Sequence, residues 1–192
     1  MQSPEKINIT ETIYRRAELI DKPLILDLLR KNLAKNLPDD EKKFGLYYEP
    51  SDDEFKKIID DSGVFLCLKG EELKGYFITM STELAKTIPF EAELVYKASD
   101  MVYDGKRIDE YKYALLAQIC IAKEYRRGMT FHRLYLGTQS MLREQGYEIG
   151  VGEISDQNSV SLAVHRNNTE VGTYTASSGI KWHVTVVELR DN

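Results

Sequence analysis

Cysteine and histidine are scarce in this sequence of 192 residues, and their scarcity argues against two classes of protein. The chain has two cysteines, Cys67 and Cys120, and no Cys-x-x-Cys pair. Both lie in apolar runs with the character of strands, so we expect buried thiols in preference to a disulfide or a metal site. The three histidines are scattered along the chain and form no cluster of metal ligands. We therefore predict a protein that binds no metal.

Long apolar runs and an excess of basic residues are missing as well. No stretch of 18 consecutive apolar residues occurs, and the first residues carry no basic patch followed by an apolar run. We therefore expect neither secretion nor a membrane partner, and we predict a cytoplasmic protein. Acidic residues outnumber basic ones by 31 to 26. Because nucleic-acid binders neutralise phosphates with many Lys and Arg, nucleic acid is not an expected partner.

The sequence does contain enough apolar material for a core, since 42% of its residues are hydrophobic. We expect one domain over residues 12–192, after a flexible tail at residues 1–11 and with an insertion at about residues 81–112. The order of periodic segments indicates an α/β (α+β) protein with a mixed sheet flanked by helices. The expected strands are residues 12–17, 64–68, 73–80, 113–122, 148–154, 173–176 and 180–189, and the expected helices cover residues 21–36, parts of 38–62, about 130–146 and a short segment after Asn158.

The most informative segment joins the expected strand at residues 113–122 to the helix that follows it. From Lys123 to Arg133, four basic residues accompany a single acid, Glu124, although the chain as a whole is acidic. A helix N-terminus offers unpaired backbone N–H groups and the positive end of the helix dipole. The sequence therefore predicts a site for phosphate or pyrophosphate here. No G-x-x-x-x-G-K-[ST] pattern occurs, which argues against nucleotide binding through a P-loop.

Two motifs in this part of the chain resemble those of the GNAT superfamily of acyl-CoA-dependent N-acyltransferases. The first, in residues 121–131, is similar to the family's strand end, its Tyr-Arg loop and the start of its R/Q-x-x-G-x-G/A pattern. When Arg126 takes the arginine position, Met129 and Phe131 stand where glycines are usual, and when Arg127 takes it, Thr130 and His132 stand there instead. The second motif, at residues 158–165, fits N-x-x-A/S-x-x-x-Y/H in register. The order of the expected elements extends the resemblance over roughly residues 14–189.

The resemblance implies a GNAT-like fold, with a mostly antiparallel sheet of six to seven strands, and acetyl-CoA as co-substrate. It implies that the end of the strand before the basic turn pairs with pantetheine and that one of its amides points at the thioester carbonyl. The alternative interpretation of this segment is an ordinary core strand. The basic turn would hold the pyrophosphate, and a plain surface turn is the alternative there. The implied coenzyme-binding residues are Ile119, Cys120, Ile121, Arg126, Arg127, Gly128, Met129, Thr130, Phe131 and Asn158.

For catalysis, the resemblance implies direct attack of an amine on the thioester in a ternary complex. His165 stands where the family often has a Tyr that protonates the departing thiolate, and a structural His on a helix is the alternative. We name Glu153 as the base that takes the proton of the amine. Glu83 and Glu91 stay open for that role, because no spacing singles out one carboxylate.

The expected reaction moves an acetyl group to a primary amine of a small molecule or a peptide. The net acidic charge favours a cationic acceptor. The Tyr-rich residues 44–48 either line the acceptor pocket or pack in the core, and packing is the favoured interpretation. A non-catalytic module that binds acyl-CoA or a phosphate ligand is the alternative from another class, and assembly as a homodimer is kept open. Release of CoA thiol only when an amine is present would favour the enzyme.

Overall fold

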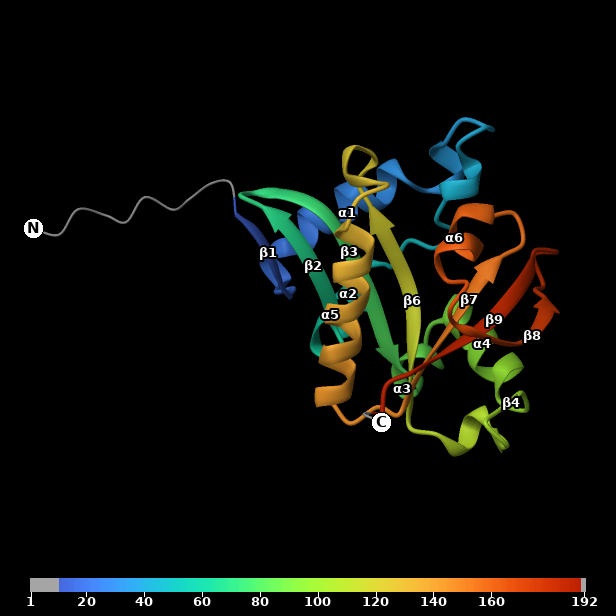
Figure 1. The fold of residues 1–192 in the computed structure, drawn as a ribbon. Helices are drawn as coiled ribbons and strands as arrows, with labels where there is room; N and C mark the ends of the chain where they lie inside the picture. Colours follow the sequence, from blue (N-terminus) through green and yellow to red (C-terminus); the bar gives the residue numbers. More distant parts are fainter. Residues whose placement is uncertain (1–10, 191–192) are drawn as a thin grey trace, which may run out of the picture.

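The computed structural model describes residues 11–190, which form a seven-stranded sheet with helices on both faces (Figure 1). The strand order is β1-β2-β3-β6-β7-β9-β8, and every pairing is antiparallel except that of β6 with β7. The predicted fold class and strand number are confirmed, whereas the predicted tail lies almost wholly outside the described residues. The strands of this sheet are β1 (Thr12–Arg16), β2 (Val64–Lys69), β3 (Glu72–Ser81), β6 (Tyr113–Ile121), β7 (Ile149–Ser155), β8 (Thr169–Thr175) and β9 (Lys181–Glu188).

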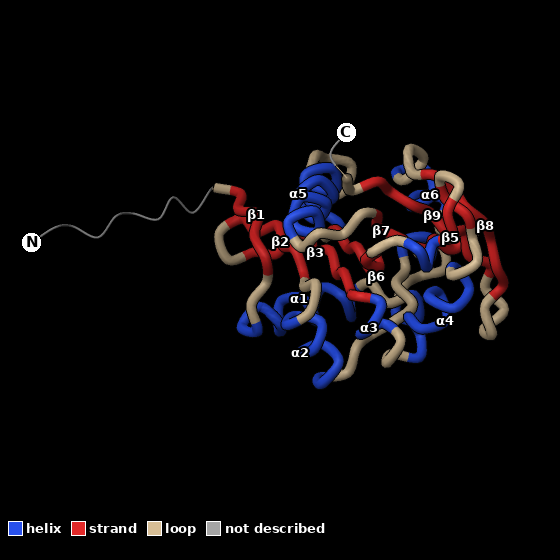
Figure 2. The backbone as a smooth tube through the Cα atoms, turned by 90° about the horizontal axis from the view of Figure 1, so that it is seen from below, coloured by secondary structure: helices blue, strands red, loops and turns tan. Residues whose placement is uncertain are grey.

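The helices are divided between the two faces of the sheet. Figure 2 shows α5 and α6 on one face and α1, α2, α3 and α4 on the other. The α-helices are α1 (Lys22–Lys31), α2 (Asp52–Asp60), α3 (Thr82–Ala85), α4 (Pro89–Ala98), α5 (Thr130–Glu144) and α6 (Ser159–Val164). Short 3-10 helices and one small hairpin complete the described chain: η1 (Leu19–Asp21), η2 (Ala34–Asn36), η3 (Lys42–Phe44), η4 (Ile108–Glu110), η5 (Lys123–Tyr125), β4 (Val102–Tyr103) and β5 (Lys106–Arg107).

Local sequence explains several of these boundaries. Helix α2 begins with a capping box in which the amide of Glu54 donates to the Ser51 hydroxyl and the amide of Ser51 donates to the Glu54 carboxylate. Helix α5 is followed by Gly146 at φ +78°, a conformation that glycine adopts without strain. The turn between β4 and β5 places Asp104 and Gly105 at positive φ, as a tight hairpin of this kind requires.

Two predicted boundaries were wrong, and tertiary contacts explain both. Helix α1 ends at Lys31 and not near residue 36, because Leu33 forms a bridge with Leu46 and the Ala34 amide donates to the carbonyl of Leu46. Strand β8 begins at Thr169 and not at residue 173, because it pairs with β9 along its whole length. The end of α1 and the start of β8 are both set by pairing with a distant segment. The local sequence pattern does not contain this information.

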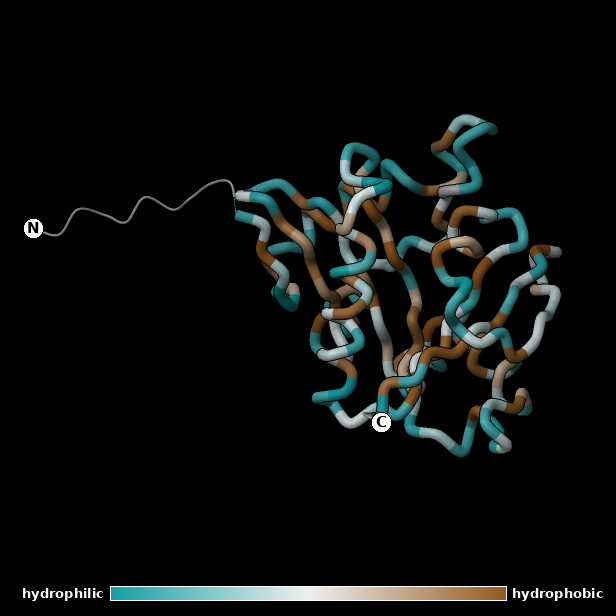
Figure 3. Tube along the Cα trace, in the orientation of Figure 1, coloured by the Kyte–Doolittle hydropathy of each residue, from teal (hydrophilic) through white to brown (hydrophobic). Residues whose placement is uncertain are grey.

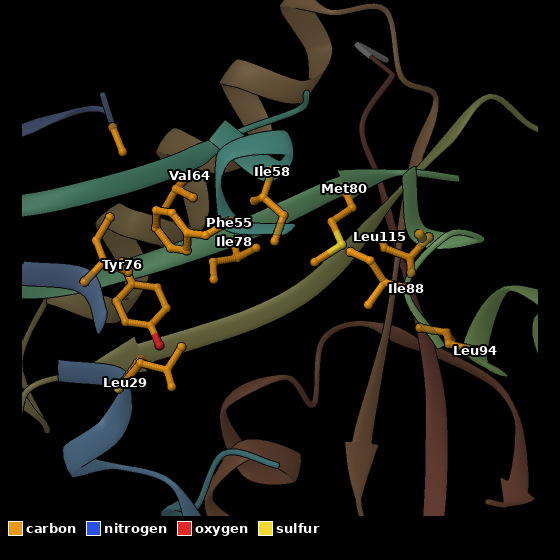
Figure 4. Close-up of a cluster of buried hydrophobic side chains, with 14 of the residues drawn as sticks. Leu29, Phe55, Ile58, Val64, Tyr76, Ile78, Met80, Ile88, Leu94 and Leu115 are labelled. Atoms are coloured by element: carbon orange, nitrogen blue, oxygen red, sulfur yellow. The ribbon is translucent and has the colours of Figure 1, made fainter. Parts of the chain in front are cut away.

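The main core lies between the sheet and the helices on the α1 side. Figure 4 shows Phe55 and Ile58 of α2 meeting Val64, Ile78 and Tyr76 of the central strands, and the Tyr76 hydroxyl pointing toward Leu29 of α1. Apolar residues run along the central strands, whereas the outer turns are hydrophilic (Figure 3). Burial of this many apolar side chains holds β3 and β6 firmly in place, so the edge of β6 is a rigid platform.

Candidate active site

Strands β6 and β7 separate after a short paired stretch, and this separation is the structural basis of the site. They pair in parallel only between residues 113–115 and residues 149–151, and Figure 1 shows them diverging beyond that point. A register shift in the pairing of β3 with β6 leaves Ala117 without a partner residue where the divergence begins. Such bulges bend a strand, so this one fits the place where β6 turns away from β7. The facing edges of the two strands are therefore open.

The backbone of β6 presents specific groups to this opening. The Ala122 amide donates to the carbonyl of Lys74 on β3, at 2.9 Å. Because the hydrogen-bonding direction alternates along a strand, the main chain of Cys120 also faces β3, whereas that of Ile119 and Ile121 faces the opening. Consistent with this, the Ile121 carbonyl accepts from Arg126 Nε at 3.1 Å. Of the three residues predicted to pair with pantetheine, Ile119 and Ile121 present their main chain to the opening, and Cys120 does not.

A cavity of about 780 Å³, called the large cavity below, extends from this opening to the basic turn and helix α6. Both positive and negative side chains line it, and Glu41 and Lys123 on its wall form an ion pair of 2.6 Å. The predicted site residues that line it are Ile119, Cys120, Ile121, Arg126, Arg127, Gly128, Phe131, Asn158 and His165.

The two arginines of the basic turn differ in their surroundings. The guanidinium of Arg126 donates to Asn32 Oδ1 at 2.6 Å as well as to the Ile121 carbonyl, so it ties the turn to β6 and to the end of α1. Arg127 is exposed, and its guanidinium makes no hydrogen bond or ion pair with residues 11–190. Its backbone lies at φ +64°, a left-handed conformation that is rare for a residue other than glycine. Arg127 is therefore the arginine that is available to an anion.

The start of helix α5 lacks a side-chain cap among the described residues. Its first amides consequently have no intrahelical or capping partner and can receive a negatively charged group. Met129 is 60% exposed, and the structure places its side chain with that of Thr130 in a separate depression facing β1. Gly128 has open space where a Cβ would be, since only the Tyr125 carbonyl lies within 4 Å of that position. The bulk of Met129 thus does not fill the large cavity.

Asn158 and His165 flank helix α6. Asn158 Oδ1 accepts from the Ser161 amide at 2.8 Å, so this residue caps the helix while it also lines the large cavity. His165 Nδ1 lies 2.8 Å from the Ser161 carbonyl, which places the proton of a neutral ring on Nδ1 and the lone pair on Nε2. Burial lowers the pKa of His165, so the ring is neutral near pH 7. His165 and Glu153 share a further cavity of about 60 Å³ between the separated strands.

Another cavity, of about 90 Å³, lies on the α1 side of the opening and is called the small cavity below. Aromatic rings from three distant segments form its walls: Tyr47 and Tyr48 before α2, Phe90 of α4 and Trp182 of β9. Tyr48 and Phe90 stack with ring centroids 5.2 Å apart, and the Trp182 ring meets Tyr47 edge to face at 5.4 Å. Packing was the favoured interpretation of Tyr47 and Tyr48 in the sequence. In the structure they also line a cavity.

Two of the three candidate carboxylates meet at the small cavity, and the third does not. Glu91 and Glu153 both line it, whereas Glu83 is exposed on α3 and does not. Burial and the nearby Glu153 raise the pKa of Glu91 to about 8. Burial also raises the pKa of Glu153 to about 7, against the hydrogen bond that it accepts from the Tyr174 hydroxyl. These values lie where a carboxylate can exchange protons at neutral pH.

A buried hydrogen-bond chain connects the sheet to the wall of the small cavity. The Tyr76 hydroxyl donates to Gln118 Oε1 at 2.6 Å, and Gln118 Nε2 donates to the carbonyl of Tyr48 at 3.0 Å. Gln118 thereby holds the segment that carries Tyr47 and Tyr48 against β6. Sequence reasoning missed Gln118, Phe90 and Trp182 as site residues, because each comes from a different part of the chain and none belongs to a local motif.

Three further properties concern the described residues only. Cys67 and Cys120 are free and buried, which confirms the predicted buried thiols. Within residues 11–190, no group of three or more His, Cys, Asp or Glu side chains is placed to hold a metal ion. In the same range, no helix is both long and apolar enough to cross a membrane.

The sequence matches no family model and no curated protein, but solved structures resemble the chain. A polyamine N-acetyltransferase of Drosophila melanogaster is 12% identical with a TM-score of 0.64, over 93% of this chain and 100% of that chain. The ribosomal-protein-S18-alanine N-acetyltransferase from Escherichia coli is 13% identical with a TM-score of 0.62, over 95% and 96% of the two chains. A chain of the NatC complex bound to Gag peptide and CoA is 8% identical with a TM-score of 0.61, over 94% and 100%. The protein therefore has the GNAT N-acetyltransferase fold.

Proposed function

We propose that this protein is an N-acyltransferase that moves an acetyl group from acetyl-CoA to a primary amine of a small molecule or peptide. The observation that carries the proposal is the opening between β6 and β7, which joins a large cavity ending at the basic turn to a small acidic and aromatic cavity. One cavity suits a long anionic coenzyme, and the other suits a compact amine. The two substrates would meet beside Ile119, which lines both.

The residues of the large cavity fit acetyl-CoA. The guanidinium of Arg127 and the first amides of α5 would bind the pyrophosphate by charge-assisted hydrogen bonds. The open main chain of Ile119 and Ile121 would pair with the peptide-like pantetheine arm, in the manner of an added strand. When bound, acetyl-CoA supplies an activated thioester carbonyl. An amide of β6 facing the opening, that of Ile119 or Ile121, would stabilise the negative charge that develops on the carbonyl oxygen during attack.

In the proposed reaction, the acceptor enters the small cavity as an ammonium ion and gives one proton to Glu153. The free amine then bonds to the acetyl carbon while the carbon–sulfur bond breaks and its electron pair goes to sulfur. The nitrogen loses its second proton, so that one ammonium ion and one thioester yield one amide, one CoA thiol and one proton. Glu153 suits the first step because its pKa of about 7 lets it hold and release a proton near neutrality.

His165 lies at the large cavity, where the departing thiolate would form. Its lowered pKa and its Nδ1 contact with the Ser161 carbonyl leave Nε2 without a proton at neutral pH. A thiolate is also a stable leaving group, because thiols have a pKa of about 8.5. The acid role of His165 stays a prediction, and we propose that its contribution is small.

A thiol-release assay with acetyl-CoA and a panel of primary amines tests the proposal. We expect CoA to appear only when an amine is added, and the acetylated amine to be detected by mass spectrometry. Tight binding of acetyl-CoA in calorimetry without release for any amine would instead favour a non-catalytic binding module. Absence of coenzyme binding would contradict both.

A further inference from the structure

Glu91 is a buried carboxyl group without a partner. It is 4% exposed on α4, and it makes no hydrogen bond or ion pair with any residue from 11 to 190. Burying a polar group without a partner costs about 1–3 kcal/mol, and more when the group is charged. Because the side chain also lines the small cavity, a hydrogen-bond donor bound there would relieve this cost. The position of Glu91 thus points to a ligand that carries donors.

The aromatic walls specify the charge of that ligand. Phe90 stacks on Tyr48, and the Trp182 ring lies edge to face with both Tyr47 and Phe90, at 5.4 and 6.4 Å between centroids. Aromatic faces attract cations within about 6 Å and gain most where water is excluded. In their ionised forms, the two acids that line the same cavity, Glu91 and Glu153, attract a cation and repel an anion. The four rings and the two acids therefore favour a cation over an anion or a neutral ligand.

The volume and position of the small cavity narrow the ligand further. A space of about 90 Å³ holds several water molecules, at roughly 10–15 Å³ each, and so admits an ammonium group with its first methylenes but not a bulky ring system. Asn158 and Ile119 line both cavities, so a nitrogen held here lies next to the end of the large cavity. The chemistry and the size together indicate a slender alkylammonium head group.

We propose that the small cavity is a recognition site for a primary alkylammonium ion, in which Glu91 accepts its N–H donors and Tyr47, Tyr48, Phe90 and Trp182 enclose its first methylenes. The inference rests on the proposed function in one respect, namely that the nitrogen bound here is the amine that reacts. Glu91 is the specificity-determining residue, because a neutral alcohol of the same shape would offer it a single donor without charge assistance.

Trp182 allows a direct binding test, because it is the only tryptophan of the chain and forms part of the cavity wall. The full chain, without acetyl-CoA, is titrated with n-butylammonium chloride at constant ionic strength and at pH 9, above the pKa of about 8 of Glu91, while tryptophan fluorescence is recorded. n-Butanol serves as the neutral probe of similar shape. The variants are Glu91→Gln and, as the matched control, Glu83→Gln on α3, which lies outside the cavity. Circular dichroism checks that each variant is folded.

We expect saturable quenching by n-butylammonium, no saturable change with n-butanol, and affinity lowered by about tenfold or more in Glu91→Gln, since a charge-assisted hydrogen bond is lost. Glu83→Gln should behave as the unaltered chain does. Equal responses to the two probes, or an unchanged affinity in folded Glu91→Gln, would overturn the inference. If Glu91→Gln fails to fold, Phe90→Leu replaces it, and full retention of affinity there would overturn it as well. The test needs no coenzyme, so its result is separate from that of the thiol-release assay.

Discussion

The two cavities that meet at the opening between β6 and β7 differ in size, charge and origin. The large cavity measures about 780 Å³ and is built mainly from one continuous stretch of chain and the helix that follows the next strand. The small cavity measures about 90 Å³ and draws its walls from five separate segments. The comparison teaches that the cavity proposed for the coenzyme is encoded largely in a local motif, whereas the cavity proposed for the amine is assembled from distant residues.

The largest expected effect separates catalysis from coenzyme binding. Glu153→Gln should lower kcat/KM for thiol release by about a hundredfold or more, because it removes the proposed base while keeping the side chain's shape. Calorimetry should show unchanged affinity for acetyl-CoA, since Glu153 does not line the large cavity. Glu83→Gln is the matched control. A parallel loss of coenzyme affinity would show that the two cavities do not act separately.

The rate of the unaltered protein should also rise with pH. Glu153 carries a raised pKa of about 7 and is faced by Tyr174 of β8 and by Glu91 and Glu93 of α4. It is therefore protonated at low pH and becomes a base as pH rises through about 7. The Glu153→Gln variant should lose this limb of the pH profile.

Arg127→Glu is expected to act on the other cavity. It should weaken acetyl-CoA binding by about tenfold or more, because a charge-assisted contact is replaced by repulsion. The melting temperature should hardly change, since Arg127 is exposed and bonds to none of residues 11–190. Arg166→Glu is the matched control, because Arg166 is exposed and lines neither cavity. An unchanged coenzyme affinity in Arg127→Glu would contradict the pyrophosphate site.

The acidity of the small cavity should also be visible in stability. Glu91 has a pKa of about 8 in the folded protein and an ordinary value of 4.5. Between these values the folded state keeps a proton that the unfolded state releases, so stability falls as pH rises through that window. Glu91→Gln removes this titration. The melting temperature of this variant, relative to that of the unaltered chain, should therefore be higher at pH 9 than at pH 6. Each kcal/mol of stability difference corresponds to roughly 2–4 °C. Calorimetric scans at both pH values check this, and parallel shifts would contradict it.

The smallest effect is expected at His165, which borders the large cavity. His165→Gln should lower kcat by less than about tenfold, because the ring is already neutral and general-acid contributions of 10² or more need a proton to give. Steady-state thiol release with a saturating amine measures it. A loss above a hundredfold would restore the acid role that the motif suggests and would place a proton donor in the large cavity.

Part of the site could be predicted from sequence, because its signals are local. The basic turn, the strand before it and the Asn158 cap were predicted from adjacent residues, and the structure brings them to one cavity. The different environments of Arg126 and Arg127 could not be predicted, because they depend on Asn32, which is far away in sequence. Likewise, the three carboxylates could not be told apart in the sequence. Only the tertiary structure brought Glu91 of α4 and Glu153 of β7 to one cavity and left Glu83 outside it.

The sequence by itself determined the order of strands and helices along the chain, the caps and tight turns, and the basic turn before a helix start, since these follow from hydrophobic period and from interactions between near neighbours. The tertiary structure alone decided that β6 and β7 separate and that Tyr47, Tyr48, Phe90 and Trp182 line one cavity together with Glu91 and Glu153. The physical reason is that pKa values and cavity walls arise from burial and from contacts between segments far apart in the chain, which no local pattern contains.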